Sequence, residues 1–276
     1  MQVPRPSPLS SSQADSVPRI LLYSHDSVGL GHLRRSLTLA GALRERLPGA
    51  AIVVATGSSR PAAFQTGEGI ELVKLPSVTK DASGTYVPRE LPLPLRRVIE
   101  LRQKLLLSLF ESFAPDVLVV DHTDRGLLGE LDPVLAEARA RGTRTILGLR
   151  DVLDAPDVVA REWGGKQERA ALAAYDRVLV YGAPEVFDPR REYPIPPELG
   201  ERLEFVGYVV RPHVPEGIQP LPRAKDQVLV TCGGGDDGLQ LVETYLESLR
   251  QTPRPWASTV VLGPLFDARE ARRIRR

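Results

Sequence analysis

Short apolar segments, most of them rich in β-branched residues, recur along most of the chain. They are apolar almost throughout and do not alternate with polar residues, which is typical of strands that are buried on both faces of a sheet. Strands of this kind belong to parallel sheets that helices cover on both sides. The pattern predicts strands at residues 19–24, 51–56, 69–75, 116–121, 144–149 and 177–182.

Apolar residues at helical spacing fill the stretches between several of these strands. One helix starts beside His32 and keeps an apolar face as far as Leu47, where Pro48 and Gly49 end it. A second amphipathic helix is predicted at residues 95–113. Strands that alternate with helices predict right-handed βαβ crossovers, and therefore a doubly wound α/β fold with a parallel, Rossmann-like sheet.

The helix at residues 95–113 has a wide apolar face with basic side chains between. Such a helix lies either on a membrane surface or over one face of a sheet with its charges in water. We favour the sheet, and leave peripheral contact with the inner face of a membrane open. The basic residues expected in water are Arg96, Arg97, Arg102 and Lys104.

The composition changes near residue 210. Residues 19–210 account for one complete α/β domain, and the proline-rich stretch 211–225 is predicted to be a linker. Over residues 226–276 the order strand, glycine loop, helix and strand begins again, as the first βαβ unit of a second domain. A sheet of about two strands is marginal alone, so we expect a C-terminally truncated chain. Residues 1–18, rich in proline and serine, are predicted to be a disordered tail.

The charges are balanced, with 36 Lys and Arg residues against 35 Asp and Glu residues and a formal net charge of +1. This balance gives no reason to expect a nucleic-acid partner. The one cysteine, Cys232, rules out an internal disulfide and fits a reducing compartment. Since no apolar run approaches the ~20 residues that span a bilayer, we expect a cytoplasmic protein.

Two glycine-rich loops each follow a predicted strand and open a helix. The first holds Gly29 and Gly31, and the second holds Gly233, Gly234 and Gly235. At such a junction unpaired backbone N–H groups and the helix dipole favour an anion, and glycine lets a ligand approach the backbone. Each loop alone is also explained by a tight strand-to-helix turn. Neither loop completes a dinucleotide-binding or P-loop motif, which makes a dehydrogenase the weakest choice.

Several polar residues stand beside the first loop or at strand ends. His32 can take a proton from a hydroxyl near neutral pH, or it bonds locally as a residue of the helix N-terminus. Asp121 ends a strand and can orient a sugar hydroxyl or a histidine, and the alternative is a solvated helix cap. Arg34 and Arg35 can neutralise a phosphate or lie on a solvated face. Because one helical turn cannot aim both arginines at the same group, we favour Arg34.

The histidine and aspartate residues also allow a hydrolase metal site. Its ligands would come from His25, Asp26, Asp121, His122 and Asp124. No HxxEH-like or paired-cysteine spacing supports such a site, so we predict no bound metal and no cofactor.

Three stretches carry a resemblance to a known family: GLGHLRRSLTLAGAL at 29–43, PDVLVVD at 115–121 and VLVTCGGGDDG at 228–238. They resemble the GT-B glycosyltransferases, which have two Rossmann-like domains. The similarity is greatest to the branch that contains the bacterial lipid-linked N-acetylglucosaminyltransferase of peptidoglycan synthesis. In a bacterial subgroup of predicted glycosyltransferases the first motif takes the form GxGHxxR.

The resemblance implies transfer of a hexosyl or N-acetylhexosaminyl group from a nucleotide diphosphate sugar to a hydroxyl acceptor, for which a lipid-linked acceptor is one option. The first domain would hold the acceptor and the second the donor. The family's pocket for the base lies further along the second domain than residue 276, so this chain alone is expected to have an incomplete donor site. The implied residues are His32 and Asp121 for catalysis, Gly29, Gly31, Arg34 and His122 for substrate binding, and Gly233, Gly234 and Gly235 for the donor diphosphate.

Two other functions stay open. A nucleotide-sugar epimerase uses the same two-domain fold, and product analysis with a labelled donor and no acceptor separates it from a transferase. A shortened chain that keeps only acceptor binding would be a non-catalytic fragment or a binding module.

Overall fold

The computed structural model describes residues 17–25, 30–61, 64, 66–81, 83–210, 226–235, 237–252 and 254–275. The main body is a sheet of 7 strands in the order β3-β2-β1-β6-β7-β8-β9, and all neighbouring strands are parallel. The doubly wound parallel sheet is confirmed, and each predicted strand is present within one residue of its expected ends. The strands are β1 (Arg19–Ser24), β2 (Ala51–Thr56), β3 (Ile70–Lys74), β6 (Val117–Asp121), β7 (Arg144–Arg150), β8 (Arg177–Tyr181) and β9 (Leu203–Phe205).

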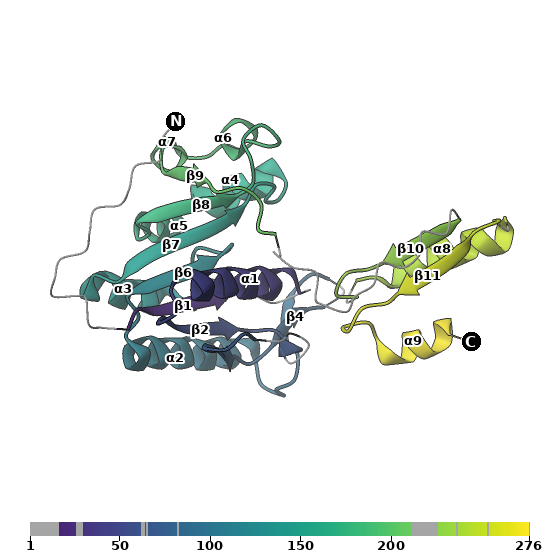
Figure 1. Cartoon of the computed structure of the whole chain (residues 1–276), viewed down its shortest axis with the longest axis horizontal. Helices are drawn as coiled ribbons and strands as arrows, with labels where there is room; N and C mark the ends of the chain where they lie inside the picture. Colours follow the sequence, from purple (N-terminus) through teal and green to yellow (C-terminus); the bar gives the residue numbers. More distant parts are fainter. Residues whose placement is uncertain are drawn as a thin grey trace.

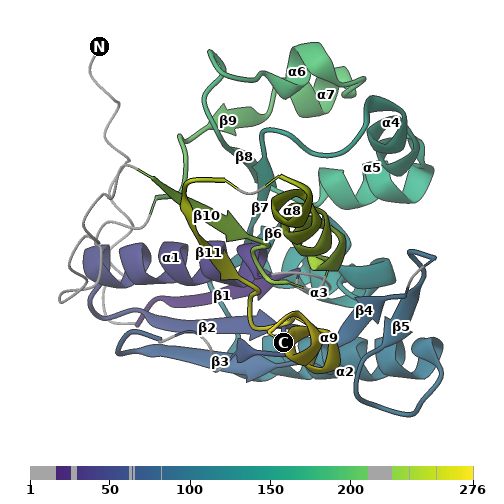
Figure 2. The same cartoon turned by 90° about the vertical axis from the view of Figure 1, so that its right-hand side faces the viewer.

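Helices cover both faces of this sheet (Figures 1 and 2). α1 (Gly31–Arg46) shares a buried apolar cluster with Leu22 of β1. α2 (Leu95–Phe113) shares another with Leu21, the preceding residue of the same strand. Because successive side chains of a strand point to opposite faces, the continuous apolar run of β1 serves both layers. The other helices of this part are α3 (Asp132–Arg141), α4 (Pro156–Gly164), α5 (Lys166–Ala173), α6 (Pro189–Glu192) and α7 (Pro197–Gly200).

The sequence pattern did not predict three short strands. β9 adds an edge to the main sheet, and β4 (Val78–Lys80) pairs antiparallel with β5 (Tyr86–Pro88) in a hairpin. Each is three residues long. A segment this short contains less than two alternations, so periodicity does not distinguish it from a loop.

The C-terminal part forms a separate two-stranded sheet of β10 (Gln227–Thr231) and β11 (Ala257–Val261), which are parallel. α8 (Leu239–Gln251) connects the two strands, and α9 (Ala268–Ile274) follows β11. This is the order of elements that the sequence predicts for this segment. The predicted linker at 211–225 and most of the predicted tail lie outside the described residues.

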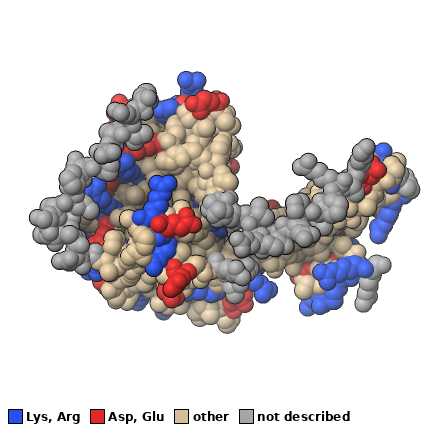
Figure 3. All heavy atoms as spheres, in the orientation of Figure 1, with Lys and Arg blue, Asp and Glu red and all other residues tan. Residues whose placement is uncertain are grey.

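Acidic and basic side chains are interspersed on the face of the molecule seen in Figure 3. Exposed partners form ion pairs such as Arg177 with Glu204, whose charged atoms lie 3.0 Å apart. No single sign of charge dominates this face, which agrees with the balanced composition. Within the described part of the chain, no helix is both long and apolar enough to cross a membrane.

The expectation that Arg102 lies in water is wrong, because its side chain is buried, with 1% exposure. It projects from the buried side of α2. Its guanidinium pairs with the fully buried Glu130, from Nε to Oε2 at 2.5 Å and from Nη2 to Oε1 at 2.6 Å. Tyr23 Oη also donates to Glu130 at 2.6 Å, and Arg102 Nη1 donates to the carbonyl of Pro76 at 2.6 Å. The missed signal was the spacing of Arg102 on the apolar stripe of α2, four residues before Leu106.

Replacing Arg102 by Met tests this buried network. The Glu130 carboxylate would stay buried without its cation, and breaking such a pair typically costs about 3–5 kcal/mol. We therefore expect urea unfolding to show a loss of stability in this range for Arg102→Met. The matched control is Arg97→Met on the exposed side of the same helix, which should change the free energy of unfolding by less than about 0.5 kcal/mol. Equal losses in the two variants would contradict the account.

Candidate functional site

The crossover pattern of the main sheet reverses between its central strands, β1 and β6. From β1 the chain passes through α1 to β2 on one side, and from β6 it passes through α3 to β7 on the other. Ligands of open α/β sheets bind at the carboxyl ends of the strands at such a switch point. His25 directly follows β1 and His122 directly follows β6, so both stand at this point.

Asp121, the last residue of β6, bonds to two side chains from the start of α1. Its Oδ2 lies 2.6 Å from His32 Nδ1. Arg35 donates from Nε to Oδ1 at 2.7 Å and from Nη2 to Oδ2 at 2.9 Å. The Asp121 side chain is 3% exposed, and those of His32 and Arg35 are 18% and 15% exposed. These three residues, named the Asp121 cluster, form a nearly buried unit.

The charge of Asp121 determines which ring nitrogen of His32 faces it as a hydrogen-bond donor. Burial alone raises the pKa of the carboxyl, but hydrogen bonds from His32 and Arg35, together with the Arg35 charge, outweigh burial and hold the pKa below its ordinary value. The ionised carboxylate only accepts hydrogen bonds. We infer that His32 donates from Nδ1, which leaves Nε2 as the nitrogen that can take a proton.

Two further imidazoles flank His32. The ring centroid of His25 lies 5.8 Å away and that of His122 lies 5.3 Å away. Burial, and next the neighbouring histidine charges, lower the pKa of His25 to about 3. Burial, followed by the charges of His32 and Arg150, lowers the pKa of His122 to about 3 as well. Both rings are therefore neutral at physiological pH, and their buried Nδ1 atoms have no hydrogen-bond partner within the described residues.

The backbone places the His122 ring beside the Asp121 cluster. Its φ is +71°, in the left-handed region that few residues other than glycine, asparagine, aspartate and histidine adopt. Its N–H donates to the carbonyl of Gly148 on β7 at 2.7 Å. The turn directs the chain away from the end of β6, into the loop that forms one wall of the site.

All three histidines line a cavity of about 560 Å³. The loop after β6 forms one wall, the β4–β5 hairpin contributes Lys80 and Tyr86, and α4 contributes Val159 and Trp163. The mixture of ionic, aromatic and aliphatic groups suits an organic molecule with both polar and apolar parts. His32 stands at the border between this cavity and the buried Asp121.

The first glycine loop is described only in part, because Gly29 lies outside the described residues. Gly31 is the first residue of α1 and lines a second, smaller cavity together with Arg34. A Cβ at Gly31 would meet nothing within 4 Å. The backbone is thus open to close approach at this position, as the predicted anion-binding turn requires.

The second glycine loop connects β10 to α8 and contains Gly233, Gly234 and Gly235. Gly235 has a φ of +94°, and a Cβ there would lie 2.1 Å from the carbonyl oxygen of Leu262. Glycine is therefore required for the packing of this turn. The Gly235 N–H donates to the carbonyl of Cys232 at 3.0 Å, so this amide already has a partner. The role of the loop in donor binding stays a prediction.

Arg35 is the site residue that the sequence analysis passed over in favour of Arg34. The available signal was its spacing, because His32 and Arg35 are three positions apart and share one face of the helix. Of the residues considered as metal ligands, the structure brings His25, Asp121 and His122 to the site beside His32, and Asp124 lines the same cavity as the histidines. Asp26 lies outside the described residues. Among the described residues, however, no group of three His, Cys, Asp or Glu side chains has the geometry to hold a metal ion.

Comparison with known proteins gives matches to structures alone. No protein-family model matches the chain, and no curated protein sequence matches it. The glycotransferase of kitacinnamycin is similar with a TM-score of 0.54 and 20% identity, over 91% of this chain and 67% of that one. The calicheamicin glycosyltransferase CalG4 has a TM-score of 0.51 and 16% identity, over 91% and 67%. UGT71G1 of Medicago truncatula, complexed with UDP-glucose, has a TM-score of 0.51 and 11% identity, over 96% and 71%.

These similarities show the fold. The chain has part of the GT-B architecture, with a parallel α/β sheet followed by the β10–α8–β11 unit. It spans about two thirds of the first two of these relatives, 67% of each. The finer resemblance to the peptidoglycan branch and the truncation stay predictions.

The low pKa values of His25 and His122 predict that acid destabilises the fold. Each ring stays neutral in the folded protein but gains a proton in the unfolded chain below about pH 6.5. The free energy of unfolding therefore decreases as the pH is lowered from about 6.5 to about 3. His122→Asn removes one such group while keeping a residue type that tolerates positive φ.

We expect the loss of unfolding free energy between about pH 7 and pH 5 to be smaller in His122→Asn than in the wild type, by about 2 kcal/mol. Urea titrations of both proteins at the two pH values measure the difference. Indistinguishable losses would mean that His122 is not held neutral by the fold.

Proposed function

We propose that this protein is a glycosyltransferase that moves a hexosyl or N-acetylhexosaminyl group from a nucleotide diphosphate sugar to a hydroxyl acceptor. The observation that carries the proposal is the 2.6 Å pairing of His32 with Asp121 at the edge of a cavity at the switch point of the sheet. The GT-B architecture supports the same class of reaction. A lipid-linked acceptor and contact with a membrane surface stay predictions.

His32 is proposed as the general base. Its Nε2 takes the proton of the acceptor hydroxyl while the acceptor oxygen forms a bond to the anomeric carbon of the sugar. The bond from that carbon to the diphosphate oxygen breaks, and its electron pair leaves with the diphosphate. Asp121 fixes the orientation of the imidazole and stabilises the imidazolium that forms, because its carboxylate stays ionised beside Nδ1.

The large cavity is proposed to hold the acceptor. Its walls come from the first domain, and it contains the Tyr86 and Trp163 rings together with charged side chains. Neutral His25 and His122 stand beside His32 in the wall of this cavity and add no positive charge to it. The glycine loop at 233–235 is proposed to meet the donor diphosphate.

Substitution of His32 tests the proposal. His32→Gln removes the proton acceptor, and loss of a general base typically lowers turnover by about 10²–10⁴-fold. Donor affinity should change little, because the imidazole acts on the acceptor hydroxyl. The assay follows release of nucleoside diphosphate from a panel of nucleotide sugars by the full chain, with and without a mixture of hydroxyl acceptors.

Glu137→Gln on α3 is the matched control, since Glu137 pairs with Arg141 on that helix and lines neither cavity. Its turnover should equal that of the wild type. Full activity in His32→Gln would remove this residue from the mechanism, and release of nucleoside diphosphate that does not depend on an acceptor would contradict the proposed function.

A further inference from the structure

A second cavity lies on the other side of the Asp121 cluster. Its volume is about 340 Å³, and it is lined by the start of α1 and by residues that end or follow β7, β8 and β9. It is named the arginine cavity because its lining includes Arg34, Arg35 and Arg150. Arg35 borders it while His32 borders the larger cavity, and both side chains bond to Asp121.

The arginine cavity has a net positive charge, since its three arginines outnumber Asp151 in the lining and the Asp121 carboxylate that pairs with Arg35. Within the described residues, Arg34 has no ion pair, and Arg150 reaches only neutral acceptors, the carbonyl of Leu153 at 3.3 Å and His122 Nε2 at 3.4 Å. The one carboxylate in the lining is Asp151. It already accepts from Tyr208 Oη at 2.9 Å and from the N–H of Val152 at 2.8 Å.

Arg35 is fixed in the wall of this cavity. Two of its nitrogens bond to Asp121, and its guanidinium carbon lies 5.4 Å from the ring centroid of the buried Tyr181. Its Nη1 makes no hydrogen bond within the described part of the chain. A guanidinium held in this way loses little side-chain entropy when its free edge binds an anion.

We propose that the arginine cavity binds a phosphate or diphosphate group of a substrate. Guanidinium groups match phosphate oxygens in geometry and charge, and the cavity is large enough to admit such a group beside Arg34, Arg35 and Arg150. The inference rests on the proposed function in one respect. A phosphate bound here would be separated only by the Asp121 cluster from an acceptor hydroxyl in the large cavity. Arg150 thereby joins Arg34 as a residue of the site, and Asp151 and Tyr208 lie in its wall.

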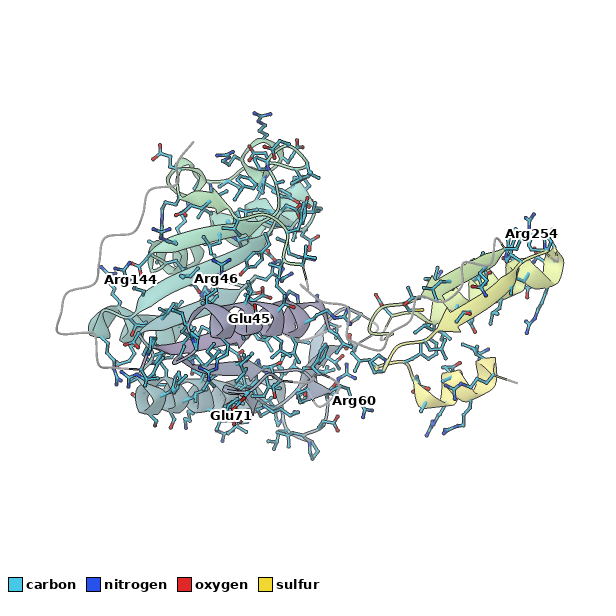
Figure 4. The ribbon with its side chains drawn as sticks, in the orientation of Figure 1. Glu45, Arg46, Arg60, Glu71, Arg144 and Arg254 are labelled. Atoms are coloured by element: carbon cyan, nitrogen blue, oxygen red, sulfur yellow. The ribbon has the colours of Figure 1, made fainter. Side chains whose placement is uncertain are left out.

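Titration calorimetry of the full chain with inorganic diphosphate tests this site. The wild type should bind, and Arg34→Gln and Arg150→Gln should each weaken binding about tenfold or more, as expected for loss of a charge-assisted hydrogen bond. Arg46→Gln removes an exposed arginine from the opposite end of α1 (Figure 4) and should bind as the wild type does. Absence of binding by the wild type, or equal binding by all variants, would overturn the proposal.

Competition then identifies the source of the phosphate. Displacement of diphosphate by UDP assigns the cavity to the donor, whereas displacement by an alkyl phosphate without displacement by UDP assigns it to a phosphate-bearing acceptor. Either result supports a phosphoryl site. The measurement needs no turnover, so binding that depends on Arg34 and Arg150 would stand even if no glycosyl transfer were detected.

Discussion

The buried carboxylate of Asp121 is the constraint on which the rest of the site depends. A carboxylate with 3% exposure needs partners for both oxygens, and this fold supplies them from a single helix turn through His32 and Arg35. The same bonds fix the orientation of the imidazole and the position of the guanidinium. One ionised group at the end of β6 thus organises the borders of two cavities.

The surrounding architecture holds this carboxylate in place. β1 and β6 are neighbours in the centre of the sheet, and helices cover both faces (Figure 2). Arg102 ties the loop after β6 to β1 and to the chain before the β4–β5 hairpin, through Glu130, Tyr23 and Pro76. The walls of the large cavity are therefore joined by a buried polar network. The fold and the site share this set of contacts.

The main sheet was predictable from the sequence because its strands are buried on both faces, and a continuous apolar run such as residues 51–56 carries that signal directly. The three-residue strands β4, β5 and β9 were not predictable, since they are stabilised by pairing with adjacent strands and are too short to show a periodic pattern of apolar residues. The placement of His32 and Asp121 at strand ends and helix starts was also predictable, from topology. The ion pair of Arg35 with Asp121 and the buried ion pair of Arg102 with Glu130 could not be predicted in this way. Each joins residues far apart in the sequence, and the spacing of residues along the chain does not show which carboxylate lies near which arginine in the fold.

The tautomer of His32 tests the central claim most directly. Long-range ¹H–¹⁵N correlation spectra of the ¹⁵N-histidine-labelled chain distinguish Nδ1 from Nε2, and with 4 histidines in the sequence the His32→Gln variant assigns the signals. The account predicts a His32 proton on Nδ1, strongly deshielded by its bond to Asp121, and loss of that deshielding in Asp121→Asn. A neutral His32 with its proton on Nε2, unaffected by the change at Asp121, would contradict it.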